Sequence, residues 1–117
     1  MIKIESFSFG TIVIGGKKYH RDVIICPDGM VKKRKGGIWM FGSHSFKKEE
    51  VEKLKGAEVA VIGLGTSARA HLSEAAKDYA QESNLELLLL PSYEAVSRLN
   101  QLIEQGKRAA AIFHITC

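Results

Sequence analysis

Three apolar segments in the second half of the chain have the pattern of buried β-strands. They are residues 58–63, 85–90 and 108–116. Strands that are almost continuously apolar are typical of a parallel sheet that is covered on both faces. We therefore expect Val61, Leu88 and Phe113 to lie buried in adjacent strands of one sheet.

Apolar residues between these segments recur at helical spacing. They predict one helix that directly follows the turn at 63–67 and runs to about Glu82. They predict a second helix from Tyr93 to about Gln105, with Ser92 as its cap. The order β-α-β-α-β indicates that the three strands run parallel. Their carboxyl ends then lie together at one end of the sheet, where ligands collect in folds of this kind.

The first third of the chain is rich in β-forming residues. Tight turns are predicted at Gly15-Gly16 and at Pro27-Asp28-Gly29, because glycine allows a positive φ and proline presets φ. A short strand is expected at 38–41, followed by a helix over 47–55 that Ser45 caps. The predicted fold class is α/β (α+β), with a β-rich N-terminal half before the parallel β-α-β-α-β half.

The composition fits one soluble domain spanning residues 1–117. Hydrophobic residues make up 45% of the chain and charged residues 26%, and no stretch is long and apolar enough to cross a bilayer. The N-terminus lacks the pattern of a secretory signal, so we expect a cytoplasmic protein without membrane contact. Cys26 and Cys117 should then stay reduced. No spacing of Cys and His suits a metal site, and no cofactor is predicted.

A run of positive charge at 32–35 contributes to a net charge of +4. Such a run can hold nucleic acid by neutralising phosphates. It lies between Pro27-Asp28-Gly29 and Gly36-Gly37, however, and no aromatic residue interleaves with it. We therefore interpret it as a solvated hairpin tip, and nucleic acid ranks last among the expected partners.

The turn after the first apolar strand carries the motif G-x-G-x-x-A at 63–68. Backbone N–H groups in such a turn, with the dipole of a following helix, can hold a phosphate or carboxylate. The candidate residues for this anion site are Gly63, Gly65, Thr66, Ser67 and Arg69. The alternative is a close strand-to-helix turn that simply needs glycine. A dinucleotide site is disfavoured, because the next strand ends in leucine and proline rather than in an acidic residue.

The last five residues, Phe113-His114-Ile115-Thr116-Cys117, invite comparison with a Cys–His nucleophile pair. Side chains alternate along a strand, so His114 shares a face with Thr116 and not with Cys117, which argues against that pair. We expect His114 to be a hydrogen-bonded residue at the edge of the sheet. The candidates for lining a pocket are Trp39, His44, Ser92, His114, Thr116 and Cys117.

Several of these features, taken in order, resemble those of a known family. Trp39 in the β-rich half, then Gly42-Ser43-His44, then residues 61–65 and the tail 113–117 are similar to the family called domain of unknown function 498. That family includes prokaryotic stand-alone proteins, an animal protein linked to adipogenesis and a mitochondrial complex I assembly factor. The resemblance implies an α/β domain with two β layers and one helical layer, without an established enzymatic activity. The single-domain form suits an archaeal or bacterial member.

Two classes of function remain open. The first is a non-enzymatic binding or assembly module that contacts another protein or forms a homo-oligomer, which the small size and the lack of a catalytic constellation favour. The second is a small-molecule or anion binder, or an enzyme. Its site would lie where 63–67, Pro91-Ser92 and Thr116-Cys117 converge at the carboxyl ends of the strands.

Overall fold

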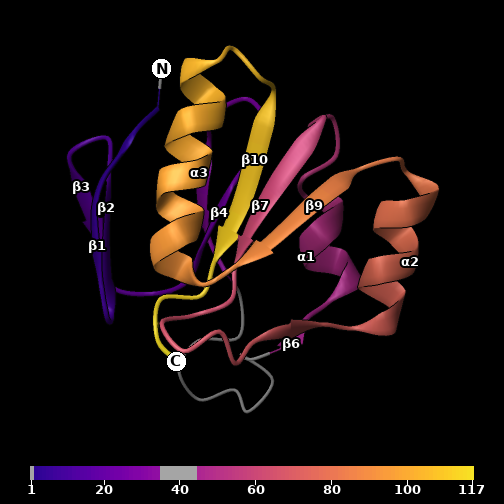
Figure 1. The fold of residues 1–117 in the computed structure, drawn as a ribbon, viewed down its shortest axis with the longest axis horizontal. Helices are drawn as coiled ribbons and strands as arrows, with labels where there is room; N and C mark the ends of the chain where they lie inside the picture. The colour runs from indigo at the N-terminus through magenta and orange to yellow at the C-terminus, as the bar shows by residue number, and fades with distance from the viewer. Residues whose placement is uncertain (1, 35–44) are drawn as a thin grey trace.

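A five-stranded sheet forms the centre of the molecule (Figure 1). The computed structural model describes residues 2–34 and 45–117. In spatial order the strands are β5 (Val31–Lys33), β4 (Val23–Ile25), β10 (Ala109–Phe113), β7 (Val59–Gly63) and β9 (Glu86–Leu90). The strands β10, β7 and β9 are parallel to one another, whereas β4 pairs antiparallel with β10 and β5 pairs antiparallel with β4. The predicted parallel β-α-β-α-β half is confirmed.

Helices cover the two faces of this sheet differently. The helix α2 (Glu74–Glu82) connects β7 to β9, and α3 (Ser92–Glu104) connects β9 to β10. Buried residues of α2 and of the short helix α1 (Lys48–Glu52) pack with Ala60 and Ile62, on one face of β7. Residues of α3 pack with Val59 and Val61, on its other face. Alternation along the strand thus divides the core into two apolar clusters.

A second, three-stranded sheet lies beside α3 and forms the second β layer (Figure 1). Its strands are β1 (Ile4–Ser8), β2 (Thr11–Ile14) and β3 (Lys17–Tyr19). Asn100 of α3 accepts a hydrogen bond from the amide of Ile4 at 3.0 Å and donates one to its carbonyl at 2.9 Å. These two bonds and the buried Ile12 and Ile14 fix this layer on the helix.

The predicted connection between β7 and α2 is wrong, because the helix does not directly follow the turn at 63–67. Residues 64–70 form an irregular turn, and β8 (His71–Leu72) then pairs in parallel with β6 (Ser45–Phe46) before α2 begins. Ser73 caps α2, because its side chain accepts from the amide of Ala76. Ser45 is likewise not a helix cap: it lies in β6, and Lys47 precedes α1.

Two further predictions from apolar and basic runs need correction. Leu88 is only partly buried, because β9 lies at the edge of the sheet, whereas Val61 and Phe113 are fully buried as predicted. The basic run is not a hairpin tip. Residues 32 and 33 belong to β5, and Arg34 is buried.

Some expectations lie outside the described residues, among them the strand at 38–41 and the positions of Trp39 and His44. Within residues 2–34 and 45–117, no helix has the length and apolar character that crossing a membrane requires.

Candidate functional site

The segments that follow the three parallel strands meet at the carboxyl end of the sheet, as predicted. Ser92, which is fully buried, connects them. Its hydroxyl accepts a hydrogen bond from the amide of Gly65 at 2.9 Å and donates one to the carbonyl of His114 at 2.7 Å. The amide of Ser92 donates to the carbonyl of Gly65 at 3.0 Å. Ser92 is therefore a bridge between three segments, and not the helix cap that its position suggested.

The glycine turn also holds the last residues of the chain. The amide of Thr66 donates to the carbonyl of Thr116 at 2.7 Å, and that of Arg69 donates to the carbonyl of Cys117 at 3.2 Å. Gly65 has a φ of +102°, and a Cβ there would lie 2.6 Å from the carbonyl of Cys117. Glycine is thus required both by the backbone conformation and by the close approach of the tail.

This geometry changes the predicted anion site. The amides of Gly65 and Thr66, which the predicted site needs as donors to an anion, donate within the protein. No helix begins at the turn, because α2 starts only at Glu74, so the expected helix dipole does not act there. Ser67 and Arg69 are exposed beside the turn, and Gly63 is buried. The amides of Gly65 and Thr66 therefore do not support the predicted anion site.

A buried polar network lies next to this turn and was not predicted. We use this term for Asp22, Arg34, Glu50, His114 and Thr116. Arg34 is 5% exposed and donates from Nη1 to Asp22 Oδ2 at 2.7 Å. Its Nε donates to Glu50 Oε2, and its Nη2 donates to the carbonyl of Ser45 at 2.7 Å. One guanidinium thus joins the start of β4, β6 and the first turn of α1.

The other half of the network is a chain of hydrogen bonds through His114. Its Nδ1 lies 2.8 Å from Asp22 Oδ2, and its Nε2 lies 3.2 Å from Thr116 Oγ1. Asp22 Oδ1 accepts from the amide of Ile115 at 2.9 Å. His114 is hydrogen-bonded and shares a face with Thr116, as predicted, but it follows the central strand β10 and does not lie at an edge of the sheet. A hydroxyl, an imidazole and a carboxylate in this order match the geometry of a nucleophile, a base and an orienting acid.

The charges in this network stabilise one another. Burial by itself raises the pKa of Asp22, but His114, the amide of Ile115 and Arg34 together bring that pKa below its ordinary value. Burial lowers the pKa of Arg34, but Glu50 and Asp22 more than offset this and raise it. Asp22 and Arg34 are therefore both charged in the folded protein near neutral pH.

The sequence offers little that could have revealed Asp22 and Arg34. Arg34 lies within a run of basic residues, of which Lys32 and Lys33 are exposed, so its burial has no local sign. Asp22 is a single acidic residue before the apolar strand β4, and it belongs to no motif. Only the antiparallel pairing of β4 with β10 brings Asp22 to His114.

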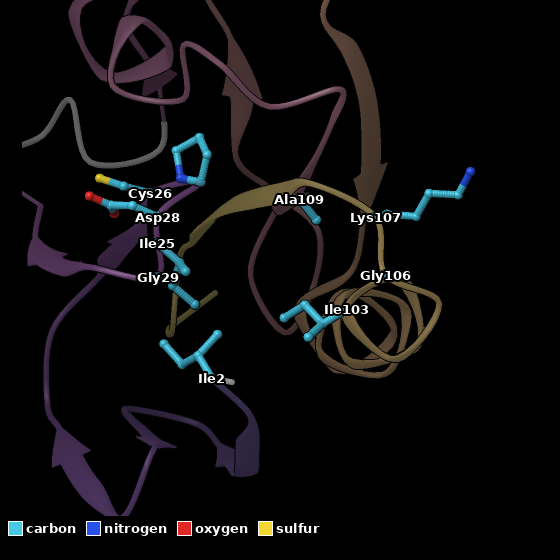
Figure 2. A pocket seen from close by; sticks show the side chains of 10 residues that line it. Ile2, Ile25, Cys26, Asp28, Gly29, Ile103, Gly106, Lys107 and Ala109 are labelled. Carbon is cyan, nitrogen blue, oxygen red and sulfur yellow. The ribbon is translucent and has the colours of Figure 1, made fainter.

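Two cavities lie at the opposite, amino end of the parallel strands. One has a volume of about 280 Å³, and Figure 2 shows Ile2 and Ile103 beside it with the side chain of Lys107 directed away. The other, of about 300 Å³, is lined by residues that include Ala57, Tyr79 and Leu85. Neither includes a residue of the predicted pocket. Among the described residues, no three His, Cys, Asp or Glu side chains gather as metal ligands would.

The fold and the buried network define a small α/β domain of mixed topology. The chain matches the model of a family described as "Protein of unknown function (DUF498/DUF598)" over residues 4–114. Since the match spans most of the sequence, the chain belongs to this family, as the resemblance predicted.

Solved structures support the same assignment. A conserved hypothetical protein from Pyrococcus horikoshii OT3 is 30% identical, with a TM-score of 0.76 over 98% of this chain and 99% of that one. The structure named MT938 is also 30% identical, with a TM-score of 0.80 over the whole of both chains. A Mth938-like domain protein from Bordetella pertussis, at 13% identity, has a TM-score of 0.77 over 97% of this chain and 85% of that one, and shows the fold alone.

Proposed function

We propose that the chain is a non-enzymatic binding module that acts through contacts with a protein partner. One observation carries this proposal: two large aromatic side chains are exposed, and one of them packs against a third aromatic ring. Phe9 is 61% exposed and Tyr93 is 53% exposed. The ring of Tyr93 meets that of Phe7 edge to face, with centroids 4.8 Å apart. We call Phe7, Phe9 and Tyr93 the aromatic surface.

Exposed aromatic residues of this kind are suited to binding. Tyrosine and phenylalanine are enriched at protein interfaces, and tyrosine is frequent among the few residues that contribute most of the binding free energy. Phe7 braces Tyr93, so that little side-chain freedom would be lost when a partner covers it. The buried polar network, in contrast, is engaged in joining β4, β6, α1 and the chain end. Its bonds account for these side chains without catalysis.

Site-directed photocrosslinking tests the proposal. A benzoylphenylalanine at Phe9 or at Tyr93 should give the same discrete protein adduct, whereas one at Met30, which is 55% exposed on the turn between β4 and β5, should not. With the purified partner, Phe9→Ser should raise the Kd about tenfold or more without lowering the unfolding temperature. Equal adducts from all three positions, or an unchanged Kd, would contradict the proposal.

A second candidate is a small-molecule or enzymatic site at the carboxyl end of the sheet, which the Thr116–His114–Asp22 chain of hydrogen bonds favours. With Nδ1–H donated to Asp22, Nε2 of His114 accepts the proton of Thr116 Oγ1 as this oxygen adds to an ester carbonyl. His114 then returns the proton to the leaving alkoxide, and water hydrolyses the acyl-threonine. Arg69, exposed beside the tail, would attract an anionic substrate.

An activated ester distinguishes the two candidates. Incubation with p-nitrophenyl acetate should place an acetyl group on Thr116, as seen by peptide mass spectrometry, and Thr116→Val should abolish it. Thr11→Val is the matched control, because Thr11 Oγ1 also lies near an imidazole, that of His20, but in an exposed position. If Thr116 stays unmodified while the reagent hydrolyses normally, the network is structural and the binding module alone remains.

A further inference from the structure

The two edge strands of the central sheet are protected to different degrees. At one edge, β5 carries the exposed Lys32 and Lys33, and edge lysines of this kind prevent unwanted strand pairing. At the other edge, β9 consists of one glutamate and four leucines, and Leu89 is 44% exposed. An apolar edge without such protection is a ready surface for another strand.

The outer side of β9 offers backbone groups at defined positions. Within the described ranges 2–34 and 45–117, β9 pairs only with β7. The amide of Leu64 donates to the carbonyl of Leu90, so Leu90 turns its backbone groups toward β7. Because residues of a strand alternate in this respect, Leu88 faces β7 as well, and Leu87 and Leu89 present their N–H and C=O groups outward.

We propose that two copies of the chain pair antiparallel through β9, about a two-fold axis at Leu88. In this register Leu87 lies opposite Leu89 of the second copy, and the two residues exchange both backbone hydrogen bonds. Symmetry repeats the exchange on the other side of the axis. Glu86 lies opposite Leu90 of the second copy, so no like charges face each other.

A second copy suits this edge for two more reasons. The side chains of Leu87 and Leu89 lie on the same face of the strand. In the dimer the four side chains from the two copies come together on one face of the joined sheet, where Leu89 loses its exposure. The pairing also ends by itself: Pro91 follows the strand and has no N–H, and in the part of the chain that the structure describes the edges that remain free are the lysine-bearing β5 strands. The assembly is therefore a closed dimer and not a fibre.

This inference concerns a different surface from the aromatic surface, so the two proposals can fail separately. Sedimentation equilibrium of the full chain over micromolar concentrations should show a monomer–dimer equilibrium. Leu89→Lys should raise the dimer Kd at least tenfold, because it creates the protection that β5 has. Met30→Lys adds the same charge at an exposed turn and should leave the Kd unchanged, as should Phe9→Ser. A monomer at every concentration, or a dimer insensitive to Leu89→Lys, would overturn the inference.

Cysteine pairing tests the register, and it also decides the matter if Leu89→Lys does not fold. The background is Cys26→Ala with Cys117→Ser. Leu88→Cys places two thiols across the axis at a non-hydrogen-bonded pair, where the Cα atoms lie about 4.5 Å apart, and mild oxidation should give a covalent dimer. Leu87→Cys is the control, since residue 87 lies opposite Leu89 of the second copy and not opposite residue 87. A covalent dimer from Leu87→Cys and none from Leu88→Cys would refute the proposed register.

Discussion

At the carboxyl ends of β7, β9 and β10 the buried groups are polar and tightly joined, whereas at their amino ends the same strands border two cavities. The carboxyl end contains the polar network and the bridge formed by Ser92. The amino end has cavities of about 280 and about 300 Å³. Polar bonds therefore determine the carboxyl end of the sheet closely, whereas the amino end borders open space. The difference predicts how substitutions will act at each.

The cause of this difference lies in directional bonding. At the carboxyl end each buried hydroxyl or charge needs a partner, because an unpaired group in the interior costs free energy. Every buried side-chain nitrogen or oxygen among the described residues has one. Apolar contacts at the amino end have no such requirement of direction. The free energy of unfolding should consequently depend on which polar side chains are present at the carboxyl end, and on side-chain volume at the amino end.

The largest effect should come from Arg34→Met. It leaves the carboxylates of Asp22 and Glu50 buried without their shared cation, which should lower the free energy of unfolding by about 3–5 kcal/mol. Urea denaturation measures this. Lys33→Met, one residue earlier on the exposed strand β5, should change stability by no more than about 0.5 kcal/mol. Equal losses in both variants would mean that the network does not stabilise the carboxyl end.

Substitutions of two glycines allow a direct comparison of the carboxyl and amino ends of the sheet. Gly65→Ala and Gly29→Ala both place a side chain at a positive φ, of +102° and +91° respectively. Only Gly65→Ala also drives a Cβ into the carbonyl of Cys117, since nothing lies within 4 Å at Gly29. We expect Gly65→Ala to be less stable than Gly29→Ala by about 1–3 kcal/mol in thermal and urea unfolding. A smaller loss at Gly65 would show that the tail is not packed closely there.

The groups that make stability depend on pH should also lie at the carboxyl end of the sheet. The pKa of Asp22 is lowered in the folded protein, so its contribution is present above the pKa of the unfolded chain and is lost as the pH falls through the folded pKa. Each unit by which the pKa is lowered corresponds to about 1.4 kcal/mol. Asp22→Asn should therefore flatten the acid limb of the stability curve. A variant as acid-sensitive as the wild type would assign that limb to other groups.

The contrast between the ends also shows what could be predicted from the sequence. The apolar run 59–62 indicated a buried parallel strand, because covering on both faces leaves a pattern in the chain itself. The edge position of β9 left no such pattern, since its leucines look like those of a central strand. Strand order decides the difference, and strand order is set by contacts between distant segments.

In the candidate site, too, features that depend on local sequence could be predicted, and features that depend on contacts between distant segments could not. The meeting of the turn 63–67 with Ser92 and Thr116 was predictable, because parallel strands bring their carboxyl ends together. The hydrogen-bond partners of Ser92 were not predictable, since a serine before a helix is expected to cap that helix. Asp22 and Arg34 were missed because a charged residue is assigned to the surface unless its partner is known, and here the partners lie in other strands.

The smallest effect is expected at the amino end, where added volume should help. Ala57 is partly buried and lines the cavity of about 300 Å³ next to β7. Ala57→Val should fill part of that space and raise the free energy of unfolding by about 0.5–1 kcal/mol. Ala60→Val makes the same change in the fully buried middle of β7 and should cost about 1–3 kcal/mol, because no space exists there. If Ala57→Val is as destabilising as Ala60→Val, the amino end is packed as tightly as the strand itself, and the contrast with the carboxyl end would rest on bonding alone.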